Sequence, residues 1–526
     1  MMRRPPLFQK ILIAMFLLGL FLPPAFIEKD SRFGTEKRTP APFPHWDGSF
    51  AGLAAFPKAF EAWFDDHFGF RRPLVQAYHL MNMLLGTTGN SRVLLGQDGW
   101  LFYTDPNDGN SLEDYRRTDP LTPEELERWR LVLETKWAWL KSKGIPYFFI
   151  IAPDKHTIYP EHCPSRIKVV GRHSRLDQFM EKIKGTEVPV IDLRGPLLEA
   201  KRLGLLYDKT DSHWNPLGAA VAYGVIMRHV AENVPGLIPK AYRPEDFFWV
   251  SKPGGDLALM LSLANVLREP AYPLPRPGLL RCTGDVLDAA EDTQDAHTVI
   301  TDCPAQGKTV LVFRDSFFTR LRRYVSESFT RSVYTFSMPD FPVMEQLIRA
   351  HRPDVVLEER VERYLKLVPS PPDPSGEPYQ AWLETLFAKG SPIYELPQGD
   401  PEALRPIHQV MITPSEQGYA LLSEGADPHL ETRTLRVDPS KKTVVRVVLL
   451  SPEETRWQIF FRTAAHLAYE EENSVSGPLH PGENRFYALV APRDTAGDSQ
   501  EMHFRLDPGT VPGLYVLKSF EVRRVP

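Results

Sequence analysis

Short apolar runs alternate with amphipathic stretches through the middle of the chain. An unbroken apolar run predicts a strand of a sheet covered on both faces, because neither side of such a strand could face water. Apolar residues at three- and four-residue spacing predict the helices between the strands. This alternation indicates an α/β domain with a mostly parallel sheet flanked by helices. The predicted strands are 147–152, 188–193, 309–313, 333–336 and 354–357, and the predicted helices are 123–143, 216–226, 318–329 and 343–350.

Local signals set the ends of several of these elements. Residues 122–125, Thr-Pro-Glu-Glu, form a capping box with proline at the first helical position. Gly144 ends the same helix. Asn215 caps a later helix, with Pro216 in its first turn. A hairpin with its turn at 97–99 is predicted ahead of these helices.

The pattern changes at both ends of this domain. Residues 57–86 predict one amphipathic helix, whose aromatic residues at helical spacing we expect in the core. After about residue 406, short alternating segments separated by turn residues predict an antiparallel β-sandwich. The strands expected there are 432–437, 443–450, 457–462, 485–490, 502–506 and 515–522.

The N-terminal residues predict an export signal. Arg3, Arg4 and Lys10 precede an apolar run from Ile11 to Leu22. Basic residues before such a run place the N-terminus inside and the body of the protein outside the membrane. No small-x-small cleavage motif follows the run, which favours an uncleaved membrane anchor over a cleaved signal peptide.

The chain of 526 residues is too long for one ordinary domain. The patterns above divide it into five segments. These are a signal anchor or signal peptide (1–28), a proline-rich stalk (29–56), the α/β domain (57–365), a linker region (366–405) and the β-sandwich, a possible carbohydrate-binding module (406–526).

Charge and cysteine usage narrow the function classes. The net charge is −5 and no basic patch stands out, so nucleic acid is not an expected partner. The three cysteines are Cys163, Cys282 and Cys303, and an exported protein can oxidise them. Cys282 and Cys303 flank an acidic stretch and can pair, although the sequence leaves this pairing open. The cysteine spacing fits no zinc site.

Two short motifs, at 211–214 and 314–317, carry the candidate chemistry. Asp211 and His213 lie two residues apart, so in an extended segment the carboxylate can orient one imidazole nitrogen while the other faces a serine. Ser316 follows the predicted strand 309–313, where a helix begins whose amides can stabilise an oxyanion. A serine hydroxyl needs a base and an orienting acid to act as a nucleophile. The three residues predict such a triad.

Each motif alone has a simpler explanation. Ser316 or Asp315 can merely cap the helix that follows, and the Asp/His pair can be a loop acid with a structural histidine. A metal site at that pair would need further ligands, for which His162 and Asp208 are weak candidates. We therefore predict neither a metal nor a cofactor.

Together, the motifs resemble the SGNH-hydrolase-like domains of the AlgJ and AlgX alginate O-acetyltransferases. The resemblance rests on Asp-x-His-Trp at 211–214, followed by Asp-Ser-Phe at 315–317 after a strand. It covers about residues 40 to 365. Further stretches that look like this family are 41–44, 64–71, 94–102 and 152–161.

The resemblance implies roles for the residues of the two motifs. Ser316 is the implied nucleophile, His213 the base and Asp211 the orienting acid. The acid and base precede the serine, as in this permuted branch and in contrast to ordinary SGNH hydrolases. One residue departs from the ordinary Gly-Asp-Ser motif, because Arg314 occupies the glycine position. That departure bears on the local backbone and on the oxyanion hole.

The implied function is a periplasmic O-acetyltransferase that modifies an exopolysaccharide through an acyl-serine intermediate. The implied partners are the polysaccharide acceptor, a membrane-bound O-acyltransferase that supplies acetyl groups, and the inner membrane. Lys155 and Tyr159 follow a strand and can line the pocket, although Tyr159 can equally be packing. Two alternatives stay open. One is a carbohydrate acetylesterase with the same triad, and the other is a non-catalytic glycan-binding scaffold.

The C-terminal sandwich weakly resembles carbohydrate-binding or accessory modules of bacterial glycan enzymes. The aromatic candidates for stacking on sugar rings are Trp457, Phe461, Tyr469 and Tyr487. Aromatic residues in sandwiches are more often part of the core, so the sequence alone selects none of the four.

Overall fold

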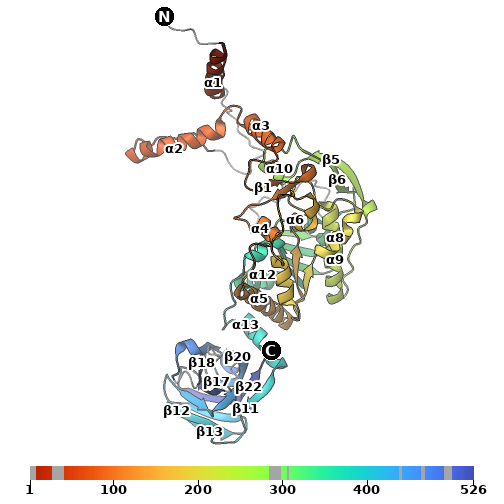
Figure 1. Ribbon diagram of the computed structural model, residues 1–526. Helices are drawn as coiled ribbons and strands as arrows, with labels where there is room; N and C mark the ends of the chain where they lie inside the picture. The colour runs from red at the N-terminus through yellow and green to blue at the C-terminus, as the bar shows by residue number, and fades with distance from the viewer. Residues whose placement is uncertain are drawn as a thin grey trace.

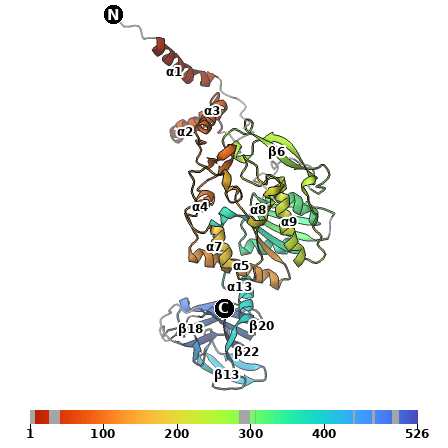
Figure 2. The same ribbon diagram turned by 45° about the vertical axis from the view of Figure 1, so that its right-hand side comes forward.

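The computed structural model describes residues 7–25, 41–282, 298–304, 307–437, 441–463, 468–490 and 500–526. Three parts follow one another along the molecule (Figures 1 and 2). Helices from the N-terminal residues lie at one end, an α/β domain occupies the middle, and a β-sandwich lies at the other end. Residues 1–6 and 26–28 of the predicted signal and 29–40 of the predicted stalk lie outside the described residues.

The N-terminal part contains three helices, α1 (Leu7–Ala25), α2 (Phe50–His67) and α3 (Arg71–Leu84). None of the helices in the described part of the chain combines the length and the apolarity needed to cross a bilayer. The prediction of one continuous helix over 57–86 was wrong. The break falls at Phe68-Gly69-Phe70, where Phe70 takes a left-handed φ of 61°. Helix α2 also begins within the segment predicted as a stalk, because Ser49 caps it by accepting from the backbone N of Gly52 at 2.9 Å.

A six-stranded sheet forms the centre of the α/β domain, in the order β4-β3-β10-β8-β9-β7. The pairs from β4 to β9 are parallel, and β7 lies antiparallel to β9 at one edge. In the register, Val356 lies opposite Tyr147 on one side and Leu311 on the other. The bounds are β3 (Tyr147–Ala152), β4 (Val190–Asp192), β7 (Thr298–Asp302), β8 (Thr309–Arg314), β9 (Arg331–Phe336) and β10 (Val355–Val361).

This sheet confirms the predicted fold class. The predicted strands overlap β3, β4, β8, β9 and β10, and the apolar residues of β3, β8 and β10 are buried. Strand β7 was not predicted, because its side chains alternate between exposed and half-buried and leave no apolar run. Strand β7 lies at the edge of the sheet and, among the described strands, pairs only with β9, so its side chains can be partly exposed to solvent.

Helices cover both faces of the sheet. Phe148 and Ile150 of β3 point into one core, and Phe149 and Ile151 point into the other. Helices α8 (Arg194–Ala200), α9 (Pro216–Asn233) and α11 (Phe318–Val325) contribute to the first core. Helices α5 (Pro123–Ser142), α7 (Arg175–Ile183) and α12 (Phe341–His351) contribute to the second.

The helix ends follow from the predicted signals. Thr122 accepts from the backbone N of Glu125 at 3.2 Å, and the Glu125 carboxylate accepts from the backbone N of Thr122 at 2.8 Å. Gly144 follows α5 with a φ of 71°, a conformation that favours glycine. Asn215 caps α9 by accepting from the backbone N of Gly218 at 3.0 Å. The predicted helix 318–329 ends earlier than expected, at Val325.

Shorter elements surround the carboxyl end of the sheet. The predicted hairpin is formed by β1 (Val93–Leu95) and β2 (Leu101–Tyr103). A second antiparallel pair, β5 (Phe247–Pro253) and β6 (Arg268–Pro275), encloses helix α10 (Asp256–Met260). Two short helices complete this region, α4 (Ser111–Arg116) and α6 (Lys155–Ile158). The 3-10 turns are η1 (Gln97–Gly99), η2 (Pro160–His162), η3 (Lys201–Leu203), η4 (Pro244–Asp246), η6 (Ser326–Ser328), η7 (Glu362–Lys366) and η8 (Glu471–Asn473).

Two antiparallel sheets form the C-terminal sandwich, which confirms the second part of the predicted fold class. One has the order β13-β14-β22-β17-β20, with β11 beside β22, and the other has the order β12-β15-β21-β18-β19, with β16 beside β21. Apolar side chains from both sheets share one core. The bounds are β11 (Ser391–Glu395), β12 (Leu404–His408), β13 (Val410–Ser415), β14 (Gly418–Ser423), β15 (His429–Thr432), β16 (Leu435–Val437), β17 (Thr443–Ser451), β18 (Thr455–Thr463), β19 (Ser474–Leu479), β20 (Gly482–Val490), β21 (Gln500–Asp507) and β22 (Gly513–Arg524).

The segment predicted as a linker region holds regular structure. Helix α13 (Glu377–Lys389) lies between the α/β domain and the sandwich (Figure 1). Its Trp382 and Phe387 share an apolar cluster with Ala138 of α5 and Val444 of β17. Strand β11 then pairs with β22. Helix α13 therefore packs against both neighbouring domains within the predicted linker region.

Candidate active site

Ser316 lies at the carboxyl end of β8, in the turn that leads into α11. The Asp315 carboxylate shapes this turn, because it accepts from the backbone N of Phe317 at 2.8 Å and from that of Val361 at 2.6 Å. The N-cap of α11 is Phe317, and no side chain caps the helix. Ser316 is half-buried, and its Oγ lies 2.9 Å from His213 Nε2. Asp315 therefore organises the turn, and Ser316 is presented to the histidine.

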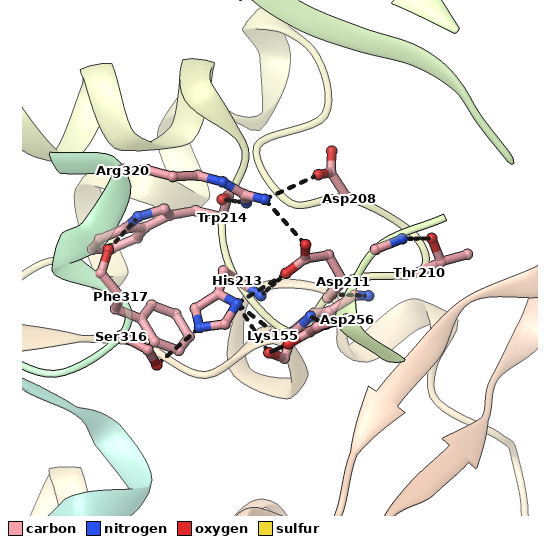
Figure 3. Close-up of polar contacts among 12 residues, drawn as sticks. Lys155, Asp208, Thr210, Asp211, His213, Trp214, Asp256, Ser316, Phe317 and Arg320 are labelled. Carbon is pink, nitrogen blue, oxygen red and sulfur yellow. Dashed lines mark hydrogen bonds and ion pairs between the residues drawn. The ribbon is translucent and has the colours of Figure 1, made fainter. Parts of the chain in front are cut away.

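Asp211 and His213 lie on the loop before α9, where the chain bends rather than being extended as expected, and the Asp211 carboxylate faces the imidazole (Figure 3). One carboxylate oxygen of Asp211 accepts from the backbone N of His213 at 3.0 Å and lies 2.9 Å from the ring Nδ1. This double contact fixes the imidazole so that Nε2 faces Ser316. The indole N of Trp214 donates to the Phe317 carbonyl at 3.0 Å and joins this loop to the Ser316 turn. The structure thus brings all three predicted residues together.

Arg320 holds the acid of this arrangement. Its Nη2 lies 3.0 Å from the second oxygen of Asp211, and its guanidinium also donates to the Trp214 carbonyl. Burial alone would raise the pKa of Asp211, but Arg320 and His213 hold it well below the usual value. Burial raises the pKa of Asp208 to about 6, although Arg320 and Lys252 lie 3.7 and 3.3 Å away. Sequence reasoning missed Arg320; its only signal is the position four residues after Ser316.

A second carboxylate, Asp256 at the start of α10, also faces the imidazole. Its Oδ2 lies 3.4 Å from His213 Nδ1, and its Oδ1 accepts from the backbone N of Ser212 at 2.7 Å. Burial would lower the pKa of His213, but the Asp211 and Asp256 carboxylates outweigh it and raise the pKa to about 9. Asp256 was not predicted, because a lone Asp after Gly254-Gly255 carries no specific signal.

Part of this chain is similar in sequence to known proteins. Residues 93–304 match the family model described as SGNH hydrolase-like domain, acetyltransferase AlgX. These residues lie in the α/β domain, which is therefore similar to the AlgJ/AlgX family. The probable alginate O-acetylase AlgJ of Pseudomonas fluorescens is 29% identical over 180 residues, which are 34% of this chain and 43% of that protein. That of Pseudomonas putida is 28% identical over 247 residues, or 45% of this chain and 59% of that protein.

The match spans less than two thirds of the length of either AlgJ relative. Among solved structures, the O-acetyltransferase domain of Pseudomonas putida AlgJ is 21% identical, with a TM-score of 0.37. That similarity covers 56% of this chain and 99% of the solved domain. The family match ends at residue 304 and so includes Asp211 and His213 but not Ser316.

The residue that departs from the ordinary Gly-Asp-Ser motif sits without backbone strain in this AlgJ/AlgX-type domain. Arg314 is the last residue of β8 and has an ordinary negative φ. Its Nη1 donates to Thr319 Oγ1 at 3.1 Å, and its guanidinium lies 5.1 Å from the centre of the Phe336 ring. The backbone at this position therefore does not require glycine.

Lys155 and Tyr159, the expected pocket residues, are buried and structural. Lys155 Nζ donates to the carbonyls of Leu101, Lys209 and Asp211 at 2.7, 2.8 and 2.9 Å. Burial lowers the pKa of this lysine to about 8. The Tyr159 hydroxyl accepts from the backbone N of Leu206 at 2.8 Å. Lys155 thus supports the loop that carries Asp211. Tyr159 packs in the interior, which was the alternative considered for it from the sequence.

The residues weighed as extra metal ligands lie elsewhere. His162 stacks on Trp100 with ring centres 4.3 Å apart and lies 3.6 Å from Asp98. Asp208 faces Arg320 and Lys252, as described above. Asp211, His213 and Asp256 present ligand-type atoms within 4.8 Å of one another. His213 Nδ1 faces the carboxylates of both Asp211 and Asp256, and Arg320 contacts the Asp211 carboxylate. These ligand-type atoms therefore already contact other side chains.

Proposed function

We propose that this chain is an O-acetyltransferase that acetylates an exported polysaccharide through an acyl-serine at Ser316. The observation that carries the proposal is the line of contacts from Ser316 Oγ to His213 Nε2, and from Nδ1 to Asp211, at 2.9 Å each. Similarity to the AlgJ/AlgX family supports the choice of acetyl transfer among the reactions that such a triad performs.

In the proposed first step, Ser316 Oγ attacks the carbonyl carbon of an acetyl donor while His213 Nε2 takes the hydroxyl proton. The bond from the acetyl carbon to the donor breaks, and the imidazolium returns the proton to the leaving group. In the second step a sugar hydroxyl attacks the acyl-serine and gives its proton to Nε2. The new sugar ester departs, and Ser316 recovers its proton. Asp211 keeps the imidazole oriented and stabilises its positive charge in both steps.

The structure weakens the argument for a non-catalytic glycan-binding scaffold. It rested on Arg314 at the position of the motif glycine, and the backbone there is that of an ordinary strand. The acetylesterase alternative differs only in the acceptor, since water would then capture the acetyl group. An assay that offers both acceptors therefore separates transferase from esterase.

We propose that the sandwich holds the polymer on the outer face of the sheet that contains β15. Trp457 and Tyr487 are almost fully buried, and Phe461 packs against the core. Tyr469 is half-buried, its hydroxyl donates to Glu431 at 2.7 Å, and Arg462 lies over its ring. Among the four aromatic candidates, Tyr469 is therefore the one to test.

Replacing Tyr469 tests this surface. Tyr469→Ala should weaken retention of the protein on an acidic exopolysaccharide column by roughly 3- to 10-fold, because one ring and its hydroxyl are lost. Tyr78→Ala, which removes an exposed tyrosine of α3, serves as the control. Equal retention of both variants and the wild type would remove Tyr469 from the proposal.

We further propose that the enzyme works in the periplasm, exported by residues 1–28, with acetyl groups supplied by a membrane-bound O-acyltransferase. The pairing of Cys282 with Cys303, at a Cα–Cα distance of 5.3 Å, supports an oxidising compartment. Fractionation of cells that express the full chain tests the location. Recovery in the cytoplasmic fraction with both thiols free would contradict it.

The central experiment uses a chromogenic acetyl ester with the purified protein, with and without an oligosaccharide acceptor. We expect ester cleavage that depends on Ser316, and acetylated oligosaccharide as the main product when acceptor is present. Ser316→Ala should abolish both, while Ser251→Ala, which removes an exposed hydroxyl, should change neither. Serine-dependent acetate release with no acetylated sugar would favour the esterase. Activity that persists in Ser316→Ala would refute the proposed nucleophile.

A further inference from the structure

The clearest feature that the proposed mechanism leaves unused is Asp256, on the segment between β5 and β6. Its two carboxylate oxygens engage the loop that carries the candidate base. Oδ1 accepts from the backbone N of Ser212 at 2.7 Å, and Oδ2 accepts from the Ser212 hydroxyl. The same Oδ2 lies 3.4 Å from His213 Nδ1 (Figure 3). A carboxylate from a separate element thus approaches the imidazole beside Asp211.

The start of α10 is fitted closely to this loop. The backbone N of Gly255 donates to Thr210 Oγ1 at 2.9 Å, and that of Leu257 donates to the Thr210 carbonyl at 3.1 Å. A Cβ at position 255 would lie 2.4 Å from the Cβ of Asp211, so only glycine allows this approach. On its other side, α10 buries Leu257 against Leu101 and other apolar residues of the β1–β2 hairpin. Asp256 is therefore held in place from both sides.

The charged groups around His213 differ in whether a cation neutralises them. Asp211 and Asp256 face the ring directly, while Arg320 from α11 is bonded to Asp211, and Lys155 from α6 is bonded to carbonyls of the loop. Much of the Asp211 charge is therefore matched by Arg320. Among the described residues, no lysine or arginine lies within ion-pair distance of Asp256. Its negative charge is thus available to the imidazole.

We propose that Asp256 is a positioning residue for His213, a second carboxylate that holds the ring and stabilises its protonated form. This inference rests on the proposed function, since it assigns a partner to the proposed base. When Ser316 gives up its proton, the imidazolium forms between two carboxylates, of which Asp256 carries the less compensated charge. The proton is therefore held tightly, and the base is free to accept one only when the solution is alkaline.

The direct test is the titration of the His213 imidazole in the intact protein, followed by NMR with labelled histidine. Loss of one signal in His213→Gln assigns the resonance. We expect a midpoint near pH 9 in the wild type. Asp256→Asn should lower that midpoint by roughly one pH unit or more, because an opposite charge close to the ring is lost. Asp256→Glu should restore part of the shift.

Asp246→Asn is the matched control, because it removes one carboxylate from the same stretch of chain. The Asp246 carboxylate accepts from the backbone N of Arg243 in the turn before β5 and should leave the His213 midpoint unchanged. An unchanged midpoint in Asp256→Asn, in a protein with wild-type circular dichroism, would overturn the inference. So would equal shifts in Asp256→Asn and Asp246→Asn.

The titration needs no catalytic activity, so it separates this inference from the proposed function. If Ser316→Ala retained full activity while Asp256→Asn shifted the midpoint, Ser316 would not be the nucleophile, but the role of Asp256 beside His213 would be supported. With an active wild type, kcat/KM for ester cleavage supplies the second measurement. The acidic limb of its pH profile should move to lower pH in Asp256→Asn by the same amount as the NMR midpoint. A limb that stayed in place would contradict the assigned role.

Discussion

Two groups of buried charges lie on the same domain, and only one of them opens to solvent. On β10, Glu358 contacts Lys136 and Arg360 at 2.8 Å each and the Tyr147 hydroxyl at 2.9 Å. The three charged side chains of this group are exposed by 4% or less. In the candidate active site, by contrast, the side chains of His213 and Asp256 are 21% and 28% exposed.

The two groups differ in how their charges are compensated and in whether one side of the group is open to solvent. Burial would raise the pKa of Glu358, but Lys136 and Arg360 outweigh it and lower the pKa. Each of those partners is itself enclosed, so the group has no side open to a ligand. In the candidate active site, Arg320 also contacts Asp211, but the chain of contacts continues through the imidazole to the half-buried hydroxyl of Ser316. The proposed function depends on this hydroxyl being accessible to a substrate.

The largest expected effect comes from removing the charge of the orienting acid. Asp211→Asn should lower ester turnover by about 10⁴-fold, because the amide neither holds the ring tautomer nor stabilises the imidazolium. Initial rates with the chromogenic ester measure this loss, and circular dichroism checks the fold. Asp302→Asn, which breaks an exposed ion pair with Arg331, is the control. A loss of less than tenfold would contradict the role given to Asp211.

The closed group should respond in the opposite way. Lys136→Met should cost about 3–5 kcal/mol in the free energy of unfolding, because it leaves Glu358 buried with less compensation. Folded protein should keep its turnover. Urea unfolding measures the cost, with Lys141→Met as the matched control, since that lysine pairs with Glu187 on the surface. An equal loss in the free energy of unfolding for the two variants would contradict the structural role of the buried Lys136–Glu358 pair.

A smaller effect is expected from the cation that links the two halves of the site. Arg320→Lys keeps the charge but loses the paired contacts to Asp211 and the Trp214 carbonyl. Misplacement of Asp211 should then lower kcat by about 10- to 100-fold with little change in KM. Arg331→Lys on the surface is the control. A change in KM alone would place Arg320 in substrate binding instead.

The smallest expected effect is on stability against pH. The pKa of His213 is about 9 in the folded protein and higher than the ordinary value of 6.5. Its protonated form therefore stabilises the fold fully below about pH 6.5, and this contribution is lost as the pH rises through 9. The wild type should exceed His213→Gln in urea midpoint at pH 6, and the gap should close by pH 10. A constant gap would mean that the ring is not held protonated.

The sequence predicted the parts of this molecule that depend on local patterns. Apolar runs located the buried strands, and the order of the two motifs located Asp211, His213 and Ser316, because each motif sits at the end of a recognisable element. Asp256 and Arg320 were not found, since their roles depend on which elements pack together. The helix break at Phe70 and the packing of α13 were missed for the same reason.

The measurement that tests the central claim most directly is a search for the acyl-enzyme itself. The protein is mixed with an acetyl ester, quenched in acid within the first turnover and digested for peptide mass spectrometry. The account predicts one acetyl group on the hydroxyl of Ser316, which disappears when an oligosaccharide acceptor is added before the quench. An acetyl group on another side chain, in a wild-type protein that still turns over, would contradict it.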